Sequence, residues 1–133
     1  PVARVLISIR RGGDSGDALD MQTDSEELLQ AGVTLASKNW DRFKHKTGWT
    51  EQTPEHIIGH QVGKQHQQHL FDTLGLPIEK DYSTFPFLGN VGSVSLPVTL
   101  AIALEKGVVE RGQKLALLGI GSGLSCIMLA YQV

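Results

Sequence analysis

The sequence has 133 residues, of which 41% are hydrophobic, and twelve basic residues against fourteen acidic residues give a net charge of −2. A chain of this length forms one domain at most, with a modest core. The near balance of charge gives no electrostatic case for binding nucleic acid or an anionic membrane. No apolar run approaches the roughly twenty residues that span a bilayer. Fifteen glycines indicate a turn-rich α/β domain rather than disorder.

The N-terminal residues alternate between apolar and other side chains from Val2 to Ile9, which predicts a strand with one buried face. Residues 11–17 have the composition of a flexible loop. We therefore assign residues 1–22 to a strand and a flexible loop, and residues 23–133 to the domain proper. The chain does not begin with Met and has no basic-then-apolar leader, so we expect either the middle of a gene product or a processed or trimmed chain.

The domain proper alternates helices and strands, which predicts a layered α/β fold. We expect a long amphipathic helix over residues 25–44 and a short strand over residues 55–60. A helix over residues 62–74 should end at Gly75. We expect a mostly buried helix with Pro97 in its first turn, and strands should follow at residues 114–118 and 124–131. The apolar positions of that buried helix are Val94, Val98, Ala101, Ile102 and Leu104.

Three stretches point to one site. The first runs from Phe85 to Pro97 and contains Asn90 between Gly89 and Gly92, two glycines that permit positive φ. The second is His60-Gln61, just after an apolar strand, and the third is the glycine-rich loop at residues 119–123. A histidine, an asparagine and a glycine loop at the ends of strands or the start of a helix suit a site that handles a carbonyl oxygen.

The order of these motifs resembles that of a known family. His60-Gln61, Gly89-Asn90, residues 105–115 and Gly119-Ile120-Gly121-Ser122-Gly123 are similar to the C-terminal half of thiolase-superfamily condensing enzymes of the ketoacyl synthase III type. Within that branch the sequence most resembles the OleA-type enzymes, which condense two long-chain fatty acyl thioesters in olefin biosynthesis. The resemblance covers residues 23–133 and has no motif over residues 1–20.

The resemblance implies a thiolase-like α/β fold of two similar halves, each a mixed five-stranded sheet flanked by helices, stacked in layers in a homodimer. It also implies a cysteine nucleophile in the N-terminal half, and no nucleophile is expected in this chain. Cys126, the single cysteine, lies in the predicted last strand among apolar residues, where a buried structural thiol is favoured over a nucleophile. One cysteine excludes an internal disulfide and fits a reducing cytoplasm.

A Claisen condensation of two thioesters develops negative charge on two oxygens, and each hydrogen-bond donor that stabilises such a charge contributes about 3 kcal/mol. By resemblance, His60 and Asn90 are the catalytic donors to the carbonyl that becomes the enolate. Backbone N–H groups at Ser122, in a loop shaped by Gly121 and Gly123, would face the first acyl oxygen. The base that removes the α-carbon proton is not identifiable in this chain.

Structural roles compete with these assignments. Asn90 alone would be a helix cap or turn residue, and this structural role is compatible with the catalytic one. The glycine loop alone could be only a tight connection between strands. Histidines at 56, 60, 66 and 69 suggest a metal site. His56 and His60 lack the intervening Glu of the zinc protease motif and span a predicted strand and turn rather than one helix face, so no metal is expected.

The leading hypothesis is an acyltransferase that joins two fatty acyl-CoAs by a non-decarboxylative Claisen condensation, in the cytoplasm, with the N-terminal half of the enzyme as partner. The substrates would be acyl-CoA or acyl carrier protein thioesters, with no cofactor. Gly63 stands where the ketoacyl synthase III branch usually has Asn, which leaves the carrier open. Two alternatives remain: a ketoacyl synthase III-type decarboxylative condensation, and a non-catalytic acyl-binding or assembly module.

Overall fold

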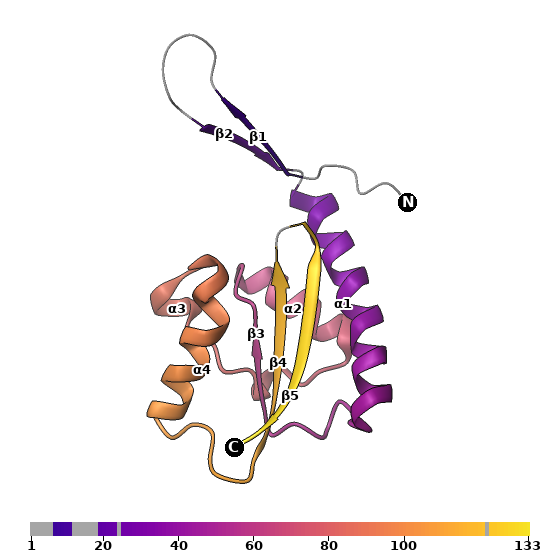
Figure 1. Cartoon of the computed structure of the whole chain (residues 1–133), viewed down its shortest axis with the longest axis vertical. Helices are drawn as coiled ribbons and strands as arrows, with labels where there is room; N and C mark the ends of the chain where they lie inside the picture. The colour runs from indigo at the N-terminus through magenta and orange to yellow at the C-terminus, as the bar shows by residue number, and fades with distance from the viewer. Residues whose placement is uncertain (1–6, 12–18, 24, 122) are drawn as a thin grey trace.

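The computed structural model describes residues 7–11, 19–23, 25–121 and 123–133, with side chains from residue 26 onward. Two short strands come first. Strand β1 (Ile7–Arg11) pairs antiparallel with β2 (Leu19–Thr23), with Ile9 opposite Met21. Figure 1 shows this hairpin beyond the N-terminal end of the first helix. The strand predicted from Val2 is therefore found from Ile7 to Arg11, β2 was not predicted, and most of the predicted loop lies outside the described residues.

The domain is built on a mixed sheet of three strands in the order β3-β4-β5. Strand β3 (His56–Gly59) runs parallel to β4 (Lys114–Gly121), which turns into the antiparallel β5 (Ser125–Gln132). The three strands predicted for this region are confirmed to within a few residues. β4 is buried on both faces from Leu115 to Leu118, which explains its continuous apolar run.

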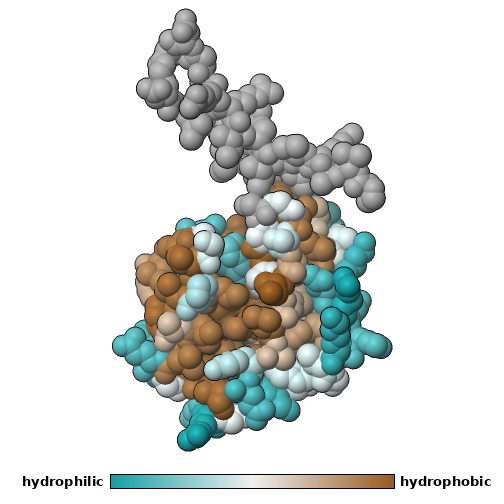
Figure 2. Space-filling view, in the orientation of Figure 1, coloured by the Kyte–Doolittle hydropathy of each residue, from teal (hydrophilic) through white to brown (hydrophobic). Residues whose placement is uncertain are grey.

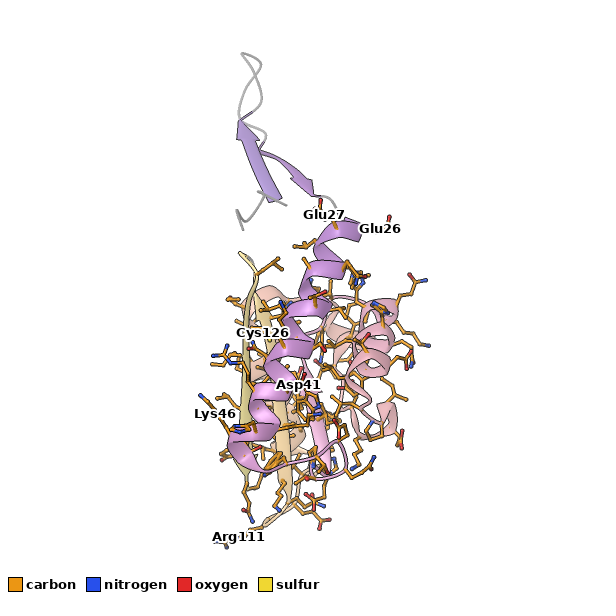
Figure 3. The ribbon with its side chains drawn as sticks, turned by 90° about the vertical axis from the view of Figure 1, so that its right-hand side faces the viewer. Glu26, Glu27, Asp41, Lys46, Arg111 and Cys126 are labelled. Atoms are coloured by element: carbon orange, nitrogen blue, oxygen red, sulfur yellow. The ribbon has the colours of Figure 1, made fainter. Side chains whose placement is uncertain are left out.

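Helices α1 (Ser25–Thr47) and α2 (Lys64–Leu74) pack on one face of the sheet, as Figure 1 shows. Apolar side chains recur along α1 at helical spacing, and Trp40 stacks on Phe43 with ring centroids 5.0 Å apart. Acidic residues in the first turn and basic residues in the last complement the helix dipole (Figure 3). The buried residues of this core are Ala36, Trp40, Phe43, Ile57, Leu70, Phe71, Leu74, Leu76, Ala116 and Leu118.

The C-terminal end of α2 is fixed by local chemistry. Gly75 adopts the left-handed conformation with φ 67°, and the N–H of Leu76 donates to the carbonyl oxygen of Phe71 at 2.9 Å. The predicted end of this helix at Gly75 is confirmed. A 3-10 turn, η1 (Ile78–Lys80), then leads the chain back to the sheet, where Asp81 forms a bridge with Ile57.

The opposite face carries α3 (Phe85–Leu88), the 3-10 turn η2 (Gly92–Val94) and α4 (Ser95–Glu105). The prediction of a mostly buried α4 is wrong. Its buried residues are the small Ser95, Thr99 and Ala103, whereas Val94 and Leu104 are exposed. Small side chains let the helix approach the sheet closely, while the larger Leu96 and Leu100 are only partly buried against the core on this face.

Part of this second face is open. Alternate residues of β5 point outward, and Ile127, Leu129 and Tyr131 are 58%, 47% and 46% exposed. Figure 2, which views this face, shows hydrophobic residues gathered over α4 and the sheet. The intervening Cys126 and Met128 pack on the α1 side. Among the helices that the structure describes, none is long and apolar enough to cross a membrane.

Candidate active site

The three predicted motifs converge on one end of the sheet, where the parallel strands β3 and β4 reach their carboxyl ends (Figure 1). His60 follows β3 directly, and its backbone N–H donates to the carbonyl oxygen of Leu118 on β4 at 2.8 Å. The first turn of α4 lies against the same end. A Cβ atom added at Gly119 would lie in ordinary contact with Leu96 of α4, at 3.6 Å, and in a tight contact with Ile127 of the paired strand β5, at 3.0 Å, so a small residue suits this position.

His60 lies at the edge of a narrow hollow. Gly59, Gln61, Gln67, Asp81 and Phe85 are among the residues that line it with His60. Burial lowers the pKa of the half-buried His60 from its usual 6.5, because the charged imidazolium loses hydration there. A neutral imidazole carries one N–H donor, and that donor suits stabilisation of an oxyanion without a change in protonation.

Asp81 is a second titratable group in the hollow and was not predicted from the sequence. Burial raises its pKa from 3.8 to about 6. The side-chain amide of Gln67 and the backbone N–H of Gly59 donate to the carboxylate and partly offset that effect. Asp81 therefore anchors the strand end that carries His60, although nothing in its sequence surroundings distinguishes it from a surface carboxylate.

Asn90 lies on an exposed turn between α3 and η2. Its side-chain Oδ1 accepts a hydrogen bond from the backbone N–H of Gly92 at 2.9 Å, and Gly89 and Gly92 both have φ of 65°. The predicted turn role of Asn90 and the predicted positive φ of both glycines are confirmed. Because Oδ1 accepts a hydrogen bond from the backbone, the Nδ2 donors of the amide are directed away from that backbone N–H. Within the described part of the chain they make no hydrogen bond.

The described residues show no direct contact between His60 and Asn90, and Asn90 does not line the hollow. A buried set of hydrogen bonds connects their segments instead. Gln61 donates through Nε2 to Thr99 Oγ1 at 3.0 Å, Thr84 Oγ1 donates to Gln61 Oε1 at 3.2 Å, and the two threonine hydroxyls are 2.7 Å apart. Sequence reasoning missed Thr84 and Thr99, which lack a motif. The only sequence feature that pointed to this set of hydrogen bonds was the position of Gln61 next to His60.

The glycine loop connects β4 to β5 at this same end of the sheet. Gly121 closes β4 opposite Ser125, Gly123 has φ 77° and Leu124 has φ 51°. Positive φ at a leucine is strained, and such strain is concentrated at functional loops. Ser122, the predicted oxyanion position, lies outside the described residues. The oxyanion assignment therefore remains a prediction.

The remaining candidates occupy structural positions. Cys126 is half-buried against α1, and its carbonyl oxygen accepts a hydrogen bond from Asn39 Nδ2 at 3.0 Å (Figure 3). His56 bonds to Gln113 at 3.1 Å, away from His66 and His69 on α2. In the ranges that the structure describes, no three His, Cys, Asp or Glu side chains group as metal ligands.

Comparison with known sequences decides the family. The sequence profile of the C-terminal domain of 3-oxoacyl-[acyl-carrier-protein (ACP)] synthase III matches residues 45–133. The chain belongs to this family. This chain is 42% identical over 109 residues to an acyl-CoA:acyl-CoA alkyltransferase of Shewanella oneidensis. The match covers 82% of this chain and 31% of that protein.

A second relative has a lower identity to this chain. A beta-ketoacyl-[acyl-carrier-protein] synthase III of Pseudomonas aeruginosa is 30% identical over 112 residues, covering 84% of this chain and 34% of that protein. This synthase III C-terminal domain therefore spans about a third of the length of the curated relatives it matches. The higher identity is to the alkyltransferase, as the resemblance to OleA-type enzymes predicted.

Solved structures agree with the thiolase-like α/β fold that was predicted. A crystal structure of Xanthomonas campestris OleA superposes on 96% of this chain and 35% of that chain, with a TM-score of 0.84 and 32% identity. FabH of Pseudomonas aeruginosa gives a TM-score of 0.81 at 25% identity, with 96% and 39% covered. The synthase III C-terminal domain thus has the fold of one half of a thiolase-like enzyme.

Proposed function

We propose that this chain is the C-terminal half-site of an acyltransferase that joins two long-chain fatty acyl-CoAs by a non-decarboxylative Claisen condensation, giving a β-keto acyl product for olefin biosynthesis. One observation carries the proposal: the segments that hold His60 and Asn90 are tied together at the carboxyl ends of β3 and β4. The chain is also more similar in sequence to an alkyltransferase, at 42% identity, than to a ketoacyl synthase III, at 30% identity.

The proposed chemistry divides between the two halves of the enzyme. A cysteine outside this sequence would hold the first acyl group as a thioester. The α-carbon of the second acyl thioester, after losing a proton to a base that is not identifiable in this chain, attacks the first carbonyl carbon. A carbon–carbon bond then forms, the carbon–sulfur bond breaks and the cysteine leaves as thiolate. His60 and Asn90 would donate to the enolate oxygen, and the loop at Ser122 to the first acyl oxygen.

The open face of the sheet supports the proposed partner. Ile127, Leu129 and Tyr131 form an exposed apolar stripe on β5, and apolar surface of this kind is usually covered by another part of the protein. We propose that the N-terminal half covers it and that the complete enzyme is a cytoplasmic homodimer. Acyl-CoA is the favoured thioester, since the relative with the higher identity is named for acyl-CoA.

The proposal is tested by substituting His60→Ala or Asn90→Ala in the intact enzyme and measuring two steps separately. We expect condensation to fall by at least about a hundredfold, as for loss of one oxyanion donor, while first-acyl loading stays within about threefold. Equal loss of both steps would contradict the assigned roles. A wild-type enzyme that binds acyl-CoA but never condenses it would favour the non-catalytic acyl-binding module.

A decarboxylative ketoacyl synthase III reaction is the second candidate, because the matching profile is that of the synthase. Product analysis separates the two reactions. A product formed from two fatty acyl-CoAs without release of carbon dioxide supports the proposal. A product formed only from a malonyl thioester, with release of carbon dioxide, supports the second candidate.

A further inference from the structure

Three buried side chains near the candidate site form a closed ring of hydrogen bonds. Thr84 gives its single hydroxyl proton to Gln61 Oε1, so the bond between the two threonines uses the proton of Thr99. Gln61 in turn donates to Thr99 Oγ1. Each member therefore donates once and accepts once within the ring.

The ring is shielded from water. Gln61, Thr84 and Thr99 are 7%, 1% and 0% exposed. Hydrogen bonds in such surroundings are strong and rigid, and an unmade one is costly, so the ring has a well-defined geometry. Apolar side chains would fill the same space, as they do on the α1 side. Polar side chains here therefore specify an arrangement rather than simply filling a core.

The members of the ring come from three places that matter to the site. Gln61 directly follows His60. Thr84 precedes α3, and its carbonyl oxygen accepts the N–H of Leu88 at 2.9 Å, so it fixes the start of the segment leading to Asn90. Thr99 lies in α4, just beyond the same segment. The ring thus joins the residue beside His60 to both ends of the segment that carries Asn90.

We propose that the Gln61–Thr84–Thr99 ring is a positioning unit that sets the spacing between the donors of His60 and Asn90. The inference rests on the proposed function of these two residues. It explains how an exposed asparagine on a turn is held relative to a half-buried histidine with which it makes no contact. None of the three ring members touches substrate in this role, and all three act through His60 and Asn90.

The test uses Thr99→Val, which keeps the shape of the side chain and removes the hydroxyl, in the intact enzyme. We expect kcat for condensation to fall by at least about tenfold, since a displacement near 1 Å can cost a hundredfold, while first-acyl loading and KM stay within about threefold. Thr99→Ser should restore kcat to within about threefold. Thr73→Val, which removes an exposed hydroxyl from α2, is the matched control and should change nothing.

Two further measurements separate positioning from general structure. In an Asn90→Ala background, Thr99→Val should lower kcat by less than about twofold more, because its effect passes through the donor already removed. Fully additive losses would overturn the proposal. Thr84→Val should change kcat, KM and first-acyl loading in the same way as Thr99→Val. This second variant keeps the test valid if Thr99→Val folds poorly.

A crystal structure of the intact Thr99→Val protein gives a result that does not depend on turnover. We expect the segment carrying Asn90 to shift relative to His60 or to adopt more than one conformation. An unchanged spacing would overturn the ring proposal even if the enzyme condenses acyl-CoA. A shifted segment in a protein that never condenses acyl thioesters would support the ring while the proposed reaction fails.

Discussion

The two faces of the sheet are built differently. Toward α1 and α2, large side chains such as Trp40 and Phe71 fill a core. Toward α4, the fully buried residues of the helix are the small Ser95, Thr99 and Ala103, whereas Leu96 and Leu100 are only partly buried and Leu104 is exposed. The first face provides stability within this domain. The second carries the hydrogen-bonded Thr99 and leaves the apolar stripe of β5 exposed.

The largest effect should come from breaking the α1 face. Trp40 is 2% exposed, stacks on Phe43 and donates through Nε1 to Glu51 at 3.1 Å. Trp40→Ala should lower the free energy of unfolding by about 3–5 kcal/mol, because it removes this packing and leaves a cavity. Denaturant unfolding measures it. Leu104→Ala on the outer side of α4 is the control, and a comparable loss there would erase the contrast between the faces.

Charge placed on the open face tests what covers it. Leu129→Lys on β5 should destabilise the intact protein by about 2–3 kcal/mol if the N-terminal half packs there, since a lysine would then be buried without a partner. Gln65→Lys, on the exposed side of α2, should stay within about 0.5 kcal/mol. Thermal unfolding compares the two variants. Equal, small effects would mean that the β5 stripe remains in water.

The hollow beside His60 predicts a pH dependence. The folded pKa of Asp81 is about 6, above the unfolded value near 3.8, so the folded state binds this proton more tightly. The ionised carboxylate thus costs stability above pH 6, and the cost disappears below about pH 4. Asp81→Asn should gain about 2 kcal/mol at pH 7.5, allowing for its partial exposure, and little at pH 4.

Unfolding midpoints of both proteins from pH 4 to pH 8 measure this difference. His60, whose pKa is lowered by burial, has the opposite effect because its folded state resists protonation. Its contribution is common to both proteins and cancels in the comparison. A gain that is constant with pH would show that the effect of Asp81→Asn is not electrostatic.

The smallest effect should be a stabilisation. Ser95 is the first residue of α4, and its Oγ is buried against the rest of the domain. This atom has no hydrogen-bond partner within the part of the chain that the structure describes. Ser95→Ala removes an unsatisfied hydroxyl and should raise the free energy of unfolding by about 1 kcal/mol. Calorimetry of the intact protein measures it. A loss of stability would instead identify a partner for Ser95 in the rest of the enzyme.

Local signals predicted most of the fold. Alternation and apolar runs placed β3, β4 and β5, and a glycine after an amphipathic helix placed the end of α2 at Gly75. The burial of α4 could not be read in this way. Its apolar residues suggested a core helix, but which side of a helix meets the sheet depends on tertiary packing, and small residues there allowed closer approach than valine or leucine.

Candidate site residues could be proposed from the sequence only where a motif existed. His60 and Asn90 stood beside recognisable neighbours, and the turn at Asn90 follows from the chemistry of asparagine and glycine. Thr84, Thr99 and Asp81 have no local signature, because their roles arise from hydrogen bonds and burial among segments distant in sequence. Asp81 in particular is distinguished by the bridge that brings it beside β3.

The parallel pairing of β3 with β4 also has a consequence for folding. Residues 60–113 separate these strands, and closing so long a segment costs more entropy than closing the tight turn between β4 and β5. We therefore expect the β4–β5 hairpin to form early and β3 to dock late. Every residue assigned to the hollow and the ring lies at or within that long connection, so the site should be assembled in the last and slowest step of folding.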